Sequence, residues 1–203
     1  PVSFRGPSDA VAAGIVPVFQ ELSLVPDLTV AENLFLREEP RNRLGLVDGR
    51  RMRRDSALLL ADLGFAGIDP GAIVRDLSLA DRQLIEIAKA LRRQPRALIL
   101  DEATSALNRR QVEQVFAVVR RLREQGTAVV FISHRMDEVR ELCDRATIFR
   151  DGEDVGTVDV AEARDDQIVH LMIGRTLRET FPPRTERPEI EAPLLEVRSL
   201  TWG

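Results

Sequence analysis

The sequence predicts an α/β fold in which helices flank a parallel sheet, and three observations support this class. Residues 97–100 form a continuous apolar run, which is typical of a strand buried in a parallel sheet. Residues 94–160 alternate between strand-like and helix-like segments, as parallel strands joined by crossover helices do. Residues 21–93 have mainly helical patterning and lie between strand-like segments.

Composition and charge narrow the class of protein. With 203 residues, 44% of them hydrophobic, the chain can fill the core of one sizeable domain. The net charge is -4 and both signs are interspersed, so no basic face favours nucleic acid. The single cysteine allows no internal disulfide, which fits a reducing compartment. No apolar run approaches the roughly 18 residues that span a bilayer, so any membrane role is expected to come through a partner.

The first elements are expected in the following order. Residues 1–20 should form a short strand, a helix around residues 9–13 and a second strand that ends at Gln20. Thr29 and Glu32 have the spacing of a capping box, which predicts a helix start.

A longer helix is expected to begin at Asp48 as its N-cap and to end at Gly64. The arginine-rich residues 50–54 are interpreted as a solvated helix face rather than an anion-binding site. The expected core residues of this helix are Leu58, Leu59 and Leu63.

The later elements follow along the chain. Strands are expected at residues 98–100, 127–132, 146–150 and 154–158, and helices at residues 112–122 and 137–143 and from Asp165 to about Gly174. The first of these helices has an apolar stripe at i, i+3, i+4, i+7 spacing. The Asp151-Gly152 pair is a hairpin signal between the last two strands. Cys143 is expected in the core and His170 on a helix surface.

Two acids stand directly after the apolar strand. Asp101 and Glu102 follow residues 97–100, and the carboxyl end of a strand is where open α/β sheets bind ligands. One carboxylate could face a magnesium ion and the other a water molecule, as a nucleoside triphosphatase requires. The alternative is that the strand simply enters a solvated turn.

Five motifs occur in a fixed order along the chain. They are Gln20 after the apolar residues 15–19, the helix start at residues 77–83, the pair Asp101-Glu102, residues 105–108, and His134 after residues 131–133. This order resembles the nucleotide-binding domain of an ABC transporter, with its Q-loop, signature helix, Walker B strand, D-loop and switch histidine. The flanking text, as at residues 28–33, 86–91 and 172–175, resembles the first half of the duplicated ATPases of sugar importers. The resemblance covers nearly the whole chain.

The resemblance implies a P-loop NTPase-like ABC ATPase fold with an incomplete parallel sheet. Residues 1–20 and 94–175 would form the ATPase core, residues 21–93 the helical signature subdomain, residues 176–193 a proline-rich linker, and residues 194–203 the first strand of a second ATPase domain. No G-x-x-x-x-G-K-[ST] segment, the loop that cradles phosphates, occurs in the sequence. We therefore expect a fragment that is inactive alone. Its sheet should have an unpaired edge, which residues 194–200 or another molecule could cover.

The resemblance also implies ATP and Mg²⁺ as cofactors and gives roles to four residues. Asp101 would hold the metal through water, and Glu102 would polarise the attacking water. His134 would contact the γ-phosphate, and Gln20 would touch the metal or the water. Each has an ordinary structural alternative, since His134 alone could cap a strand end and Gln20 alone is uninformative.

The signature helix and the D-loop would contribute nucleotide contacts in the composite site, from Ser78, Leu79, Ala80, Asp81, Gln83 and Asn108. The common signature is Leu-Ser-Gly-Gly-Gln, whereas residues 77–81 here read Leu-Ser-Leu-Ala-Asp. Ser78 and Asp81 suit a variant capping box. A carboxylate at this helix end opposes a second anion, so we expect the composite site that uses this signature to be weak or inactive. Asn108 replaces the usual D-loop acid.

Three functions remain open. In the first and leading one, the chain is a fragment of an ATP-hydrolysing subunit that powers carbohydrate import through an ABC transporter, in the cytoplasm on the inner face of the cell membrane. There it would touch membrane permease subunits through residues 21–60, pair head to tail with a second ATPase domain, and work indirectly with an external sugar-binding protein. A non-catalytic interaction or regulatory module is the second, although Glu102 and His134 argue against it. An ABC protein acting on DNA or ribosomes is the third, and the low basic charge argues against it.

Overall fold

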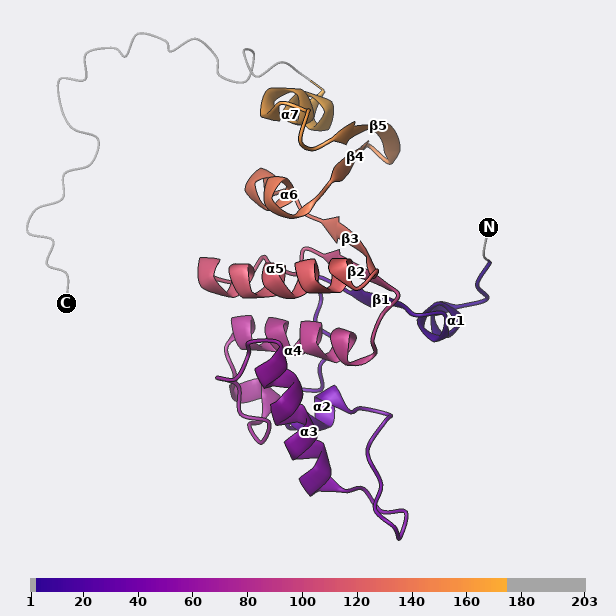
Figure 1. Ribbon diagram of the computed structural model, residues 1–203, viewed down its shortest axis with the longest axis vertical. Helices are drawn as coiled ribbons and strands as arrows, with labels where there is room; N and C mark the ends of the chain where they lie inside the picture. Colours follow the sequence, from indigo (N-terminus) through magenta and orange to yellow (C-terminus); the bar gives the residue numbers. More distant parts are fainter. Residues whose placement is uncertain (1–2, 175–203) are drawn as a thin grey trace, which may run out of the picture. The chain divides into compact units, whose positions relative to one another are not determined.

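The computed structural model describes residues 3–174, whose elements are shown in Figure 1. The chain divides into two compact units, Pro1–Asp144 and Arg145–Gly203. No helix among the described residues is both long and apolar enough to cross a bilayer.

A parallel sheet organises the first unit, as predicted. Its order is β1 (Ile15–Val18), β2 (Ala97–Asp101) and β3 (Ala128–Ile132). In the register Val16 lies beside Leu98, and Leu98 beside Val129. Leu98 and Leu100 of the central strand are completely buried, which explains why this strand is an unbroken apolar run.

Two crossovers connect these strands. The helical subdomain leads from β1 to β2, and α5 (Arg109–Glu124) leads from β2 to β3. The apolar stripe of α5 is in the core as predicted, and its Phe116 meets Phe131 of β3 edge to face at 5.9 Å. The short helix α6 (Met136–Leu142) then follows β3. All three strands therefore point their carboxyl ends toward the same edge of the sheet.

The start of the chain differs in part from the prediction. Helix α1 (Pro7–Ala12) has Pro7 at its first position, where the missing N–H costs nothing. The short strand expected before it is absent from residues 3–6, and β1 ends at Val18, two residues before Gln20. Gln20 thus lies in a bend, outside the sheet.

Residues 21–93 contain four helical segments. They are α2 (Val30–Leu34), α3 (Gly49–Asp62), a short 3-10 turn (Val74–Asp76) and α4 (Leu79–Arg92). Figure 1 shows α2, α3 and α4 grouped together. The predicted capping box of Thr29 and Glu32 is present, with the Glu32 carboxylate accepting the Thr29 N–H at 2.7 Å. Residues 35–48 are largely non-helical, so the expectation of a mainly helical region holds only in part.

Helix α3 begins at the predicted cap, because the Asp48 side chain accepts the Arg51 N–H at 3.0 Å. Leu63 is buried and Leu59 is partly buried, as predicted. The prediction is wrong for Leu58, which is 64% exposed, and Leu60 is buried instead. Met52, Ser56 and Leu60 recur every four residues and so share the face toward the core. The arginines of residues 50–54 are solvent-facing, as expected.

The second unit contains a hairpin and a helix. Strands β4 (Arg145–Arg150) and β5 (Glu153–Asp159) are antiparallel, and the predicted turn has φ of 55° at Asp151 and 82° at Gly152. Positive φ at both positions is the requirement of a type I′ hairpin turn. Helix α7 (Asp165–Ile173) ends at Gly174, whose φ is 76°, and His170 is exposed on it.

Some predictions lie outside the described residues. These are the linker at 176–193, the further strand at 194–203 and the covering role of residues 194–200. Among the described strands of the first sheet, β3 is an edge, and its Val130 and Ile132 are exposed.

Candidate functional site

The site is centred on Glu102, at the carboxyl end of the sheet. Gln20 Nε2 donates to Glu102 Oε2 at 3.2 Å, and His134 Nδ1 lies 3.1 Å from Glu102 Oε1. The three residues follow three neighbouring parallel strands, so the sheet itself brings them together. The His134 side chain is 68% exposed and that of Glu102 is 28% exposed, which leaves both accessible to a ligand.

Glu102 has an unusual backbone conformation. Its φ is 47°, in the left-handed region, where a residue with a Cβ carries about 1–3 kcal/mol of strain. The Glu102 N–H donates to Ile132 O at 3.0 Å, and the Glu102 carbonyl accepts the Ser105 N–H at 3.1 Å. The turn after β2 is therefore held against the end of β3.

The contact between His134 and Glu102 constrains the imidazole protons. A neutral ring that donates from Nδ1 to Glu102 has no proton on Nε2, which is then an acceptor. Only the imidazolium donates from both nitrogens at once. A neutral His134 can therefore donate to a phosphoryl oxygen only if its ring leaves the arrangement described here.

Asp101 is the last residue of β2 and is half-buried. Within residues 3–174 its carboxylate has no hydrogen-bond or ion-pair partner, and no cluster of three His, Cys, Asp or Glu could cage a metal ion. Mg²⁺ is usually held by one or two carboxylates together with phosphates and waters. The available oxygen donors therefore fit a nucleotide-bound Mg²⁺ and do not fit an all-protein metal site.

The signature residues form the start of α4. Ser78 is its N-cap and accepts the Asp81 N–H at 3.1 Å. The Ser78 hydroxyl donates in turn to Asp81 Oδ2 at 2.7 Å. A hydroxyl has one proton to donate, so Asp81 takes the proton that a bound anion would otherwise receive. Leu79 is exposed at the same helix end.

Two predicted nucleotide contacts have other surroundings. Gln83 is buried at 3% exposure, and its Nε2 has no hydrogen-bond partner among the described atoms. Asn108 caps α5 through a capping box with Gln111. The structure therefore brings Gln20, Glu102 and His134 together, whereas in its described part no hydrogen bond or ion pair joins the signature residues to those three.

Sequence patterns did not single out two buried acids. Glu86 of α4 accepts two hydrogen bonds from Ser23, and Glu138 of α6 accepts hydrogen bonds from Thr104 and Ser133. Both are glutamates in helices, where exposure is the ordinary expectation. Cys143 is half-buried, and burial followed by the nearby Asp144 charge raises the pKa of its thiol. It therefore lacks the thiolate character of a reactive cysteine.

Comparisons with known proteins find related sequences. Residues 5–105 match a protein family model described as ABC transporter. The chain is 49% identical, over 203 residues, to a ribose import ATP-binding protein of Rhizobium etli, and this match covers 100% of the chain and 39% of the relative. A protein of the same name from Rubrobacter xylanophilus is 50% identical over 98% of the chain and 39% of its own length. The chain thus spans well under half the length of these relatives.

Solved structures show the same fold. A dimeric ATP-binding cassette, MJ0796, in a post-hydrolysis state with ADP and Pi is similar with a TM-score of 0.64 and 24% identity, over 76% of this chain and 68% of that one. The structure of the ATP-binding cassette MJ1267 in its ADP conformation is similar with a TM-score of 0.66 and 20% identity, over 86% of this chain and 74% of that one. At this identity the likeness concerns the fold alone.

Proposed function

Because this chain belongs to the ABC transporter family of ATPases, we propose that it forms part of an ATP-hydrolysing subunit that powers carbohydrate import. The observation that carries this proposal is the convergence of Gln20 and His134 on Glu102, at 3.2 and 3.1 Å. A carboxylate in an ordinary solvated turn would be hydrated, whereas Glu102 contacts two side chains that follow neighbouring strands. The printed names of the relatives, ribose import ATP-binding proteins, support the choice of cargo class.

The chemistry of the proposed reaction is attack of water on the γ-phosphate. Glu102 orients the water and accepts its proton, since its carboxylate is partly exposed and fixed in direction by the strained turn. Gln20 holds one carboxylate oxygen and so limits rotation of Glu102. His134 donates a hydrogen bond to the γ-phosphate, either after its ring has left Glu102 or as the imidazolium with protons on both nitrogens. Asp101 is the oxygen donor that would hold Mg²⁺ through water, and the metal supplies charge neutralisation of the phosphates when bound.

The phosphate cradle is not among these residues, because the 203-residue sequence contains no G-x-x-x-x-G-K-[ST] segment. We therefore expect calorimetric titration of this chain with MgATP to show no tight binding. Tight binding that is lost in Asp101→Ala would instead assign the cradle to another backbone loop of this chain.

Partners follow from the same proposal. Residues 21–60 would contact the membrane permease, and a second ATPase domain would face this one head to tail. An external sugar-binding protein would act only through the permease. The subunit would then lie on the cytoplasmic face of the membrane. The names of the relatives support the import function, and the absence of a membrane-spanning helix among residues 3–174 is compatible with contact through a partner.

A chimera tests the catalytic assignment. In the Rhizobium etli relative, the matched residues would be replaced by this 203-residue chain, and phosphate release would be measured. We expect Glu102→Gln to retain ATP binding and to lower hydrolysis at least about 100-fold, the scale of a lost general base. Glu113→Gln, an exposed residue of α5, is the matched control and should leave the rate unchanged. Undiminished hydrolysis in Glu102→Gln would contradict the assignment.

A non-catalytic module is the second candidate, and the Ser78–Asp81 hydrogen bond favours it, because it occupies the signature hydroxyl. The same chimera separates the candidates. A non-catalytic domain predicts that Glu102→Gln changes neither ATP binding nor hydrolysis.

We also propose that the composite site built on this signature is weak. The Asp81 carboxylate already accepts the Ser78 proton, and it adds like charge where a phosphate would approach the helix. At an effective dielectric of about 20, two charges about 4 Å apart repel by about 4 kcal/mol before screening. In the chimera, Asp81→Gln should therefore raise steady-state hydrolysis. An unchanged rate would count against the proposal.

A further inference from the structure

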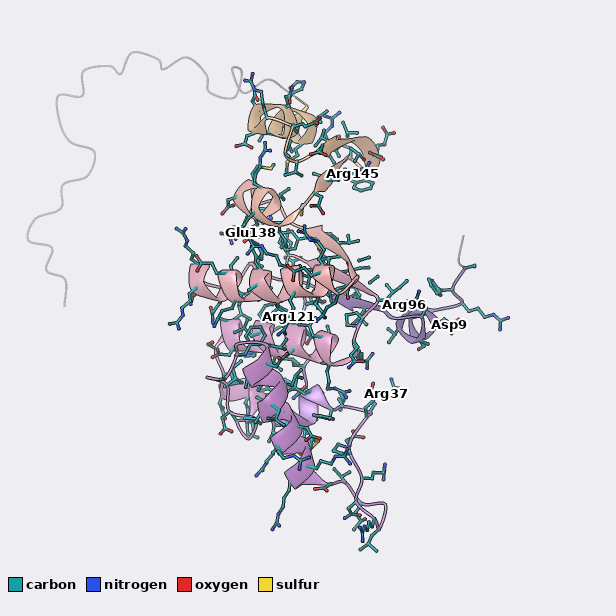
Figure 2. All side chains as sticks on the ribbon, viewed as in Figure 1. Asp9, Arg37, Arg96, Arg121, Glu138 and Arg145 are labelled. Atoms are coloured by element: carbon teal, nitrogen blue, oxygen red, sulfur yellow. The ribbon has the colours of Figure 1, made fainter. Side chains whose placement is uncertain are left out.

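A buried carboxylate connects the two loops that carry Glu102 and His134. Glu138, in the first turn of α6, is 2% exposed and is labelled in Figure 2. Its Oε2 accepts a hydrogen bond from Thr104 Oγ1 at 2.7 Å and one from Ser133 Oγ at 3.2 Å. Thr104 lies two residues after Glu102, and Ser133 lies directly before His134. One carboxylate oxygen therefore joins the two sides of the candidate site.

The second oxygen of Glu138 is paired by charge. Arg135 Nη1 lies 2.6 Å from Glu138 Oε1, although without the alignment of a hydrogen bond. The Arg135 N–H also donates to Ser133 Oγ at 3.0 Å. A buried carboxylate is costly unless its partners stay in place. The cluster of Thr104, Ser133, Arg135 and Glu138 therefore resists separation of the loops that it joins.

The strained turn at Glu102 needs such support. A left-handed glutamate persists only where its surroundings over-determine it. The hydrogen bond from Glu102 N–H to Ile132 O fixes the turn on the β3 side. Beyond Glu102, Ala103 and Thr104 are buried, and the Thr104 hydroxyl ends on Glu138. The turn is thus held from both sides, and Glu138 supplies the second hold.

We propose that Glu138 is a positioning residue that sets the distance between Glu102 and His134. Its consequence for hydrolysis rests on the proposed function, whereas its effect on the two side chains does not. The ordinary role of Glu138 would be to stabilise the start of α6, where an acid favours the helix dipole. That role explains the hydrogen bond from Ser133. It does not explain the hydrogen bond from Thr104, which belongs to a different loop.

The experiment uses the two histidines of the chain, His134 and His170, which give two sets of imidazole ¹⁵N signals. The wild-type 203-residue chain, labelled at histidine, would be compared with four variants and with Glu102→Gln as the reference for a broken contact. Thr104→Val removes one hydroxyl at nearly constant shape, and Glu138→Gln removes the charge. Thr127→Val, whose hydroxyl donates to Pro95 O, is the matched hydroxyl control. Glu141→Gln, an exposed acid of the same helix, is the matched acid control. His170, exposed on α7, is the internal reference.

We expect Thr104→Val and Glu138→Gln to move the His134 ring signals toward their positions in a Glu102→Gln variant, with His170 unmoved. Hydrogen exchange of the Glu102 amide should accelerate about tenfold in both, which corresponds to about 1.4 kcal/mol. The two controls should change neither readout. Because none of these measurements involves ATP, they can succeed even if the proposed function fails.

Wild-type His134 signals in folded Thr104→Val and Glu138→Gln would overturn the inference and leave Glu138 as part of the α6 start. If Glu138→Gln does not fold, Thr104→Val decides the matter alone, since it leaves the carboxylate and its charge partner in place. An effect in Thr127→Val equal to that in Thr104→Val would also overturn it, by showing that any lost hydroxyl disturbs the site.

Discussion

Glu86 provides the sharpest test of how the segment after Gln20 is attached to the signature helix. Its Oε1 accepts the Ser23 hydroxyl at 2.6 Å, and its Oε2 accepts the Ser23 N–H at 3.1 Å. Lys89 Nζ donates to Ser23 Oγ at 2.8 Å and lies 3.7 Å from Glu86 Oε1. Ser23 is three residues after Gln20, and Glu86 belongs to the helix that Ser78 begins. The cluster therefore links these two parts of the candidate site.

The size of the effect follows from these contacts. In Glu86→Gln the carboxylate charge beside the Lys89 ammonium is lost, and the amide NH₂ replaces either the acceptor of the Ser23 N–H or the acceptor of the Ser23 hydroxyl. Hydrogen bonds to a charged group contribute about 1.5–3 kcal/mol, and both ends of the Lys89 pair are largely shielded from water. We expect Glu86→Gln to lower the free energy of unfolding by about 2–3 kcal/mol and Ser23→Ala by about 1 kcal/mol. Their double-mutant coupling should exceed about 1 kcal/mol.

Urea unfolding followed by far-UV circular dichroism measures these differences. The matched control is Glu113→Gln, which breaks an exposed ion pair with Arg109 on α5 and should cost less than about 0.5 kcal/mol. The reasoning is refuted if Glu86→Gln costs no more than this control. A coupling with Ser23→Ala within about 0.3 kcal/mol of zero would refute it equally, since additivity means that the two residues act independently.

Two further predictions concern the core and the pH dependence of stability. Leu98 in the central strand is 0% exposed, so Leu98→Ala should lower the free energy of unfolding in urea by about 2–5 kcal/mol. Leu58 is exposed, so Leu58→Ala should lower it by less than about 0.5 kcal/mol. Equal losses in the two variants would contradict the core assignment. The hydroxyl of Thr29, followed by its N–H, lowers the pKa of Glu32. Its stabilisation should therefore be complete above the unfolded value of about 4.3 and should disappear as pH falls through the lowered folded value. The difference in unfolding free energy between wild type and Glu32→Gln should then shrink between pH 7 and pH 3, and a constant difference would exclude this linkage.

The strands and the grouping of Gln20, Glu102 and His134 could be predicted because their signals are local. Residues 97–100 are apolar without interruption, and in the structure one face of this strand is fully buried and the other is partly buried. Once three parallel strands are accepted, their carboxyl ends must meet at one edge, and the residues after them must be near one another. Gln20, Glu102 and His134 were therefore predictable as a group, although their distances were not.

The features that escaped prediction depend on contacts between distant segments. Residues 58–60 are three consecutive leucines, so the sequence alone does not show which of them faces the core. The packing of α3 decides that Leu60 is buried and Leu58 exposed. The left-handed Glu102 is likewise set by an acceptor on another strand, Ile132 O. No local pattern at residue 102 carries that information.

In and around the candidate site, three carboxylates, those of Glu86, Glu138 and Asp81, accept a hydroxyl proton, and the position of each decides its consequence. Glu86 and Glu138 each accept a hydroxyl proton from a neighbouring loop, and both are buried, so each braces a part of the candidate site from inside the protein. Asp81 also accepts a hydroxyl proton, but its donor is Ser78, the residue expected to meet the nucleotide. A carboxylate that accepts a proton from a hydroxyl outside the binding position stabilises the site. A carboxylate that accepts the proton of Ser78 leaves that hydroxyl with none to donate to a nucleotide. This difference predicts opposite results for the same kind of substitution: Glu138→Gln should loosen the Glu102–His134 pair, and Asp81→Gln should free Ser78 and raise hydrolysis.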